Sequence, residues 1–231
     1  MNGRLDVGDT LGEVFQIYRS HAGVLLPLAF WLFLVVAIVD GVVGTDVALL
    51  PLVIVVSTIV GTLYQGMEVG LVRDVQDGRR DSSVSELFGF AVPVLLPLIG
   101  AGLLSGIAIG IGVVLFIAPG LILLTIWAVI APAIVIERAS IFAAFSRSRQ
   151  LVRDHGWAVF GVVITAFLIQ AIGAVIFGSI AAGIADGAIV RIVFSALAST
   201  ITAPIVALAA GVLYYRLLPL QAPATPPAAE L

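Results

Sequence analysis

The sequence has no cysteine and no lysine, and charged residues make up only 11% of its 231 positions. The absence of cysteine excludes disulfide bonds, thiolate catalysis and cysteine-ligated zinc or iron–sulfur sites. The scarcity of charge excludes an ordinary water-soluble domain, in which about 25% of residues are charged. Hydrophobic residues make up 61% of the chain, so we predict a polytopic, all-α membrane protein. Its formal charge of −3 does not favour a nucleic acid as partner.

Long uncharged intervals locate the predicted spans. A membrane helix needs about 20 apolar residues to cross the bilayer. Four intervals between ionisable residues fit one helix each, while the 50 uncharged residues between Glu86 and Glu137 are enough for two. The turn signal at Ala118–Pro119–Gly120 divides this interval. The six predicted transmembrane helices lie near residues 22–44, 47–71, 92–116, 120–136, 157–184 and 190–217.

The arginines predict the orientation of these spans. Ten of the eleven fall in segments that six spans place on one side of the membrane, and only Arg191 falls on the other. The positive-inside rule then predicts a multi-pass protein of the cell membrane with both termini in the cytoplasm and the links near 45, 118 and 187 outside. We predict one membrane domain over residues 1–220. The Ala/Pro-rich segment 221–231 is typical of a disordered tail.

A threefold repeat is indicated by three amphipathic segments, near 9–20, 82–90 and 140–154, each of which precedes a predicted hairpin of two spans. Capping boxes, in which a Ser or Thr and a Glu satisfy free amides at a helix start, are predicted at Thr10–Glu13 and Ser83–Glu86. The third segment has an apolar face opposite its arginines, which suits a helix at the headgroup boundary. The pentapeptide Val24–Leu28 recurs as Val94–Leu98, so we predict three copies of an interfacial helix followed by a hairpin. Chance similarity between Leu/Val/Pro-rich segments is the alternative.

The central part of the chain resembles a known family on its motifs, which include Pro119–Gly120, Trp127–Pro132, Ala143–Arg149 and Leu151–Trp157. These motifs, together with Gly8–Tyr18 and Pro204–Tyr215, resemble the glycerophosphoryl diester phosphodiesterase membrane-domain family. Some members of that family carry an additional catalytic barrel, which needs roughly 200 or more residues, and this sequence contains no such domain. The resemblance implies a membrane fold and a link to lipid or polyol-phosphate metabolism. It provides no catalytic residue.

Polar residues inside the predicted spans are candidate functional residues. Glu68 lies about one turn inside the cytoplasmic end of the second span beside Gln65, and Gln170 falls near the middle of the fifth. A small transporter or permease with a polar site near Glu68 and Gln170 is therefore one functional hypothesis. The alternative for Glu68 is snorkelling to water or pairing with an arginine, and for Gln170 an interhelical hydrogen bond.

Small residues recur every fourth position on three spans, and this spacing is typical of close helix packing in lipid. The alternative is that such a stripe lines a flexible gate or a lipid groove. The predicted packing residues are Gly102, Gly106 and Gly110 on the third span, Ala174, Gly178 and Ala182 on the fifth, and Ala203, Ala207 and Gly211 on the sixth.

Arginines on the predicted cytoplasmic face are candidate ligands for anionic lipid headgroups, although the positive-inside rule alone accounts for them. They are Arg79, Arg80, Arg147, Arg149 and Arg153. The two histidines, His21 and His155, both lie where an amphipathic segment meets a span, and no nucleophile, metal or phosphate-loop motif is present. We therefore expect no enzyme activity, no metal and no cofactor. The first hypothesis is a protein that binds or organises membrane lipids or partners, including copies of itself, at the cytoplasmic face.

Overall fold

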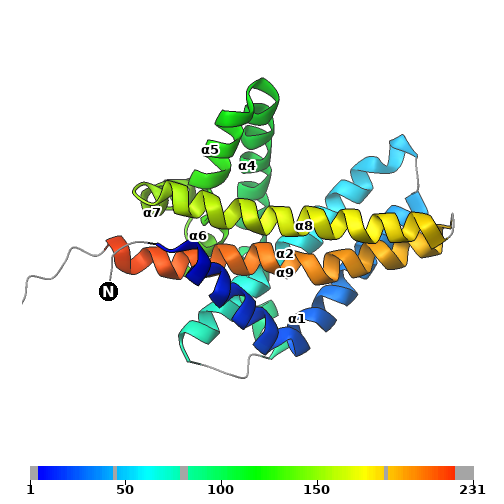
Figure 1. Ribbon diagram of the computed structural model, residues 1–231, viewed down its shortest axis with the longest axis horizontal. Coiled ribbons are helices and arrows are strands. Elements are labelled where there is room, and N and C mark those ends of the chain that lie inside the picture. The colour runs from blue at the N-terminus through cyan, green and yellow to red at the C-terminus, as the bar shows by residue number, and fades with distance from the viewer. Residues whose placement is uncertain (1–4, 44–45, 79–82, 185–186, 222–231) are drawn as a thin grey trace, which may run out of the picture.

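The computed structural model describes residues 5–43, 46–78, 83–184 and 187–221, and these residues form helices and no strands (Figure 1). The all-α prediction is therefore confirmed. The helices are α1 (Val7–Val43), α2 (Leu50–Gln76), α3 (Val84–Ala91), α4 (Leu95–Leu115), α5 (Ile117–Ile126), α6 (Ile130–Glu137), α7 (Ile141–Val152), α8 (Gly156–Ile184) and α9 (Ala188–Gln221). Short 3₁₀ turns, Val47–Leu49 and Val92–Val94, lead into α2 and α4.

Six helical segments in the described part of the chain are long and apolar enough to cross a membrane. They are Val7–Val43, Val47–Gln76, Val84–Leu115, Ile117–Glu137, Gly156–Ile184 and Ile189–Gln221. Each contains or closely matches one of the predicted spans. This agreement follows from the composition, because uninterrupted apolar sequence of that length has few stable arrangements other than a helix in lipid.

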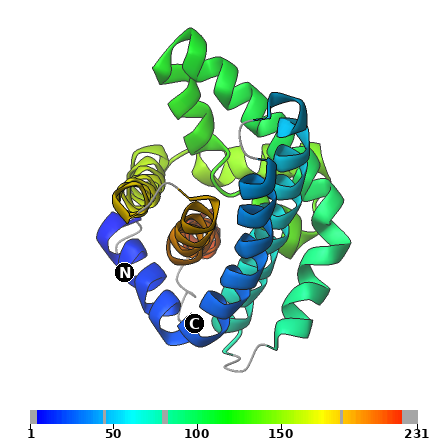
Figure 2. The same ribbon diagram turned by 90° about the vertical axis from the view of Figure 1, so that its right-hand side faces the viewer.

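Three hairpins diverge from a common packed end, as the two perpendicular views show (Figures 1 and 2). The hairpins are formed by the second part of α1 with α2, by α4 with α5, and by α8 with α9, and in Figure 1 the α4–α5 hairpin stands across the direction of α8–α9. We call the packed end the base, and its fully buried side chains include Val14, Met67, Leu87, Ile134, Leu151 and Leu213. Near the hairpin tips large apolar side chains are exposed instead, for example Leu115, Val175 and Ile189. Each hairpin follows one of the three amphipathic segments.

The first amphipathic segment is not a separate helix, contrary to the prediction for 9–20. It is the start of α1, which begins at Val7, because the Asp6 side chain accepts a hydrogen bond from the Asp9 amide at 2.9 Å and so caps the helix there. Thr10 lies inside α1 and its hydroxyl donates to the Asp6 carbonyl oxygen at 2.6 Å, so the predicted capping box at this site is wrong. Both views show α1 bent (Figures 1 and 2), and Pro27 inside the helix removes a backbone hydrogen bond and favours such a bend.

The second and third amphipathic segments form the short helices α3 and α7. The predicted capping box before α3 is confirmed, because the Glu86 amide donates to Ser83 Oγ at 3.3 Å and the Ser83 amide donates to Glu86 Oε2 at 3.0 Å. Helix α7 follows Ser140 and buries the predicted apolar face, including Ala144 and Leu151, in the base. It is therefore a packed part of the fold.

The fourth span is interrupted, contrary to the continuous helix predicted over 120–136. Helix α5 ends at Ile126 and α6 begins at Ile130, with a turn between them. The reversal between α4 and α5 occurs at Phe116, which is extended with φ −154° and ψ 130°, before the predicted turn signal at 118–120. Those residues are already in α5.

The predicted stripe of Gly102, Gly106 and Gly110 is exposed, and a Cβ built on any of the three would meet nothing within 4 Å. It does not pack against another part of the described chain. The residues Ala174, Gly178 and Ala182 line a groove of about 620 Å³ against α9, and their role in helix packing stays a prediction. A homo-oligomer or another membrane protein as partner stays a prediction.

Other glycines make the close contacts between helices. A Cβ on Gly112 would lie 2.9 Å from the Gly120 nitrogen, and a Cβ on Gly66 would lie 3.0 Å from the Ala91 Cβ. Gly211, the last member of the predicted stripe on the sixth span, does pack closely, since its Cβ would lie 3.0 Å from Val72 Cγ2.

Candidate functional site

A groove of about 1140 Å³ opens between α5, the end of α7 and the start of α8. Its apolar wall includes Leu121 and Ile122 from α5 and Trp157 and Phe160 from α8. Trp157 is 88% exposed, so this wall is not covered by another part of the described chain. The groove is also lined by Arg149, Arg153, Asp154 and His155, from the end of α7 and the link to α8, and by the polar residue Thr125 of α5.

Arg149 and Arg153 are exposed and form no ion pair with any residue in the described ranges. Two other arginines near the base have an acidic partner. Arg216 binds Glu13 at 2.7 Å, and Arg73 lies 3.7 Å from Asp77. The groove therefore combines an apolar wall with two guanidinium groups that are available to an anion.

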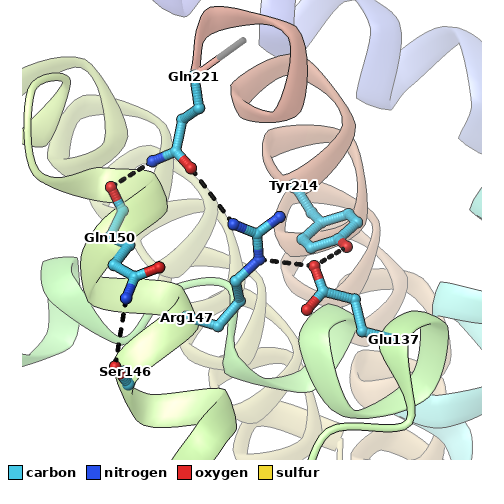
Figure 3. A network of polar contacts seen from close by, with 6 residues as sticks. All are labelled: Glu137, Ser146, Arg147, Gln150, Tyr214 and Gln221. Atoms are coloured by element: carbon cyan, nitrogen blue, oxygen red, sulfur yellow. Dashed lines mark hydrogen bonds and ion pairs between the residues drawn. The ribbon is translucent and has the colours of Figure 1, made fainter.

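Arg147, which the sequence placed with these arginines, has a different role (Figure 3). Its Nε donates to Glu137 Oε1 at 2.7 Å, and the Tyr214 hydroxyl donates to the same oxygen at 2.6 Å. The hydrogen bond with Glu137 raises the pKa of Arg147, so the guanidinium stays charged. Because Glu137, Arg147 and Tyr214 belong to α6, α7 and α9, the network joins three helices of the base.

Gln221 extends this network and corrects the predicted start of the tail. It is the last residue of α9, and its Oε1 accepts a hydrogen bond from Arg147 Nη1 at 3.3 Å, while its Nε2 donates to the Gln150 carbonyl oxygen (Figure 3). The rest of the predicted tail, 222–231, lies outside the described residues, as do Arg79 and Arg80.

Ser148 stabilises the turn that separates α5 from α6. Its hydroxyl donates to the Ile126 carbonyl oxygen at 2.8 Å and accepts from the Val129 amide at 3.3 Å. The side chain is fully buried, so one hydroxyl satisfies a backbone group on each side of the turn that would otherwise lack a partner. Ser148 lies in the third predicted amphipathic segment, but it was not predicted to be a functional or structural residue. A lone hydroxyl on the buried face of that helix is the available signal.

We expect Ser148→Ala to lower the free energy of unfolding by about 1.5 kcal/mol, because two buried backbone groups lose a hydrogen-bond partner. Ser146→Ala is the matched control, since Ser146 lies on the exposed side of the same helix. Chemical unfolding in detergent, followed by circular dichroism, measures both. Equal stability of the two variants would contradict the role of Ser148.

Neither Glu68 nor Gln170 lines any of four grooves and cavities found in the described part of the chain, whereas a transport site would need them in a common one. Gln65 lines a small cavity of about 220 Å³ together with Ser105 and Trp127, and neither Glu68 nor Gln170 belongs to its lining. Glu68 is fully buried and forms no ion pair with a described arginine, so both snorkelling and arginine pairing are wrong as explanations for it.

Within the described ranges, no group of three or more acidic or histidine side chains is placed to hold a metal ion. Comparison with protein-family models, with curated proteins and with solved structures found no match. The family resemblance therefore stays a prediction, and the groove beside Arg149 and Arg153 is the feature from which a function can be argued.

Proposed function

We propose that this integral membrane protein binds an anionic lipid in the groove between α5, α7 and α8. The observation that carries the proposal is that Arg149 and Arg153, which form no ion pair within the described ranges, lie beside an open apolar wall. A phosphate headgroup is a strong acceptor for guanidinium donors, and an acyl chain matches the wall formed by Leu121, Ile122 and Phe160. A ligand with both parts uses the whole groove.

The orientation predicted by the arginines supports this assignment. With the base at the cytoplasmic side, Arg149 and Arg153 lie at the level of the inner headgroups, where anionic lipids attract basic side chains. The family resemblance, with its link to lipid or polyol-phosphate metabolism, points to the same class of ligand. A small transporter is the second hypothesis, and it has less support because the Gln65 cavity excludes Glu68 and Gln170.

We expect the double variant Arg149→Gln, Arg153→Gln to bind phosphatidylglycerol about 25-fold more weakly than the unaltered protein. Each arginine contributes about 1 kcal/mol near an anionic surface, and about 1.4 kcal/mol corresponds to a factor of ten. The measurement is native mass spectrometry of the protein titrated with phosphatidylglycerol in detergent, with phosphatidylcholine as the neutral lipid.

The control removes the same number of charges elsewhere. Arg19 and Arg191 are exposed and lie outside the groove, so Arg19→Gln, Arg191→Gln tests the effect of net charge. Glycerol 3-phosphate, which has the headgroup chemistry without acyl chains, is expected to compete poorly because it leaves the apolar wall uncovered. Equal losses in the two double variants, or full competition by glycerol 3-phosphate, would contradict a lipid groove.

A further inference from the structure

Glu68 differs from Glu13 and Glu137 in the surroundings of its carboxyl group. Glu13 and Glu137 each bind an arginine at 2.7 Å. The Glu68 side chain is fully buried, and neither of its carboxylate oxygens has a hydrogen-bond partner among the described residues. Burial of a carboxylate charge without a counter-ion is strongly unfavourable, so this position disfavours an ionised group.

The neighbours of Glu68 are tyrosines and apolar residues. Tyr64, one turn earlier on α2, lies beside the carboxyl, and its hydroxyl donates to the Leu25 carbonyl oxygen of α1 at 3.3 Å. Tyr18 of α1 also interacts electrostatically with Glu68, and its hydroxyl donates to the Ile201 carbonyl oxygen at 3.1 Å. In the described part of the chain, these two tyrosines are the titratable groups that interact with Glu68, and no arginine forms an ion pair with it.

We propose that Glu68 is a proton-binding site, at which the carboxyl carries a proton while α1 and α2 are packed as seen here. A neutral acid in this position needs only a hydrogen-bond partner, and the Tyr64 hydroxyl is adjacent. An ionised carboxylate needs water or a cation. Packing of the helices excludes water, and the described residues do not provide a cation. Release of the proton therefore requires the helices packed around Glu68 to open to water. The site is independent of the lipid groove, which Glu68 does not line.

This proposal can be tested by infrared spectroscopy of the protein in lipid nanodiscs at neutral pH. The spectrum of each variant is subtracted from that of the unaltered protein. The carbonyl stretch of a protonated carboxylic acid lies above the amide I band and is absent from a carboxylate. We expect the unaltered protein to show this band and Glu68→Gln to lack the Glu68 contribution. Asp40→Asn, which removes an exposed carboxyl from α1, is the control and should leave the band unchanged.

Glutamine has the size of the neutral acid, so we also expect Glu68→Gln to fold with an unchanged midpoint of thermal unfolding. An identical acid band in the unaltered protein and in Glu68→Gln would overturn the proposal, because Glu68 would then be ionised. Failure of Glu68→Gln to fold would overturn it as well, since a neutral side chain of the same shape would not replace the native group. Loss of the band with retained folding is the outcome that supports a proton-binding site.

Discussion

Gly112→Ala is expected to lower the free energy of unfolding by about 3 kcal/mol, at the upper end of the cost of overpacking. The added Cβ would lie 2.9 Å from the Gly120 nitrogen and 3.0 Å from the Gly120 Cα. Both are backbone atoms at the start of α5, so no side chain can rotate away, and the α4–α5 hairpin must open. Chemical unfolding in detergent, followed by circular dichroism, measures the change.

Gly110→Ala is the matched control on the same helix. A Cβ at Gly110 meets nothing within 4 Å, and alanine is a better helix former than glycine by about 1 kcal/mol. We therefore expect this variant to be as stable as the unaltered protein or slightly more stable. If Gly110→Ala proved as damaging as Gly112→Ala, the exposed stripe would contain the true contact and the hairpin packing described here would be wrong.

These two glycines show what spacing can and cannot predict. A four-residue repeat identifies a stripe of small residues, but it does not determine which side of α4 meets a neighbour. That depends on the turn at Phe116. The nearby Pro119–Gly120 signal predicts that the chain reverses, but it does not determine which face of α4 then meets α5. The spans were predictable because a run of uncharged residues suffices to define them, and their bounds agree with the helices to within a few residues outside α1 and the interrupted fourth span.

The interruption at 127–129 was not predictable from local sequence. No glycine or proline occupies these positions, and the turn is held by Ser148 from α7, about twenty residues later in the chain. The same limitation applies to the groove, whose walls come from α5 and α8. The sequence indicated arginines on an amphipathic helix. Only the packing distinguishes Arg147, which binds Glu137, from Arg149 and Arg153, which do not bind it.

The ion pair of Glu137 with Arg147 can be tested by an exchange of charges between α6 and α7. We expect Glu137→Arg and Arg147→Glu each to lower the free energy of unfolding by about 2 kcal/mol. Each removes a hydrogen bond between charged groups, worth about 1.5–3 kcal/mol, and places like charges together. Since 30% of each side chain is exposed, solvent screening keeps the effect below that of a fully buried pair.

The double variant Glu137→Arg, Arg147→Glu restores opposite charges across the same gap, so we expect it to be more stable than the sum of the single changes by at least about 1 kcal/mol. Tyr214 prevents complete recovery, because its hydroxyl donates to Glu137 at 2.6 Å and an arginine at that position offers no acceptor. Arg149→Glu, on the same helix but without an ion pair in the described chain, should leave stability within about 0.5 kcal/mol. A double variant no more stable than that sum would mean that Glu137 and Arg147 do not interact directly. A strong destabilisation by Arg149→Glu would instead assign that residue to the packed base and remove it from the lipid groove.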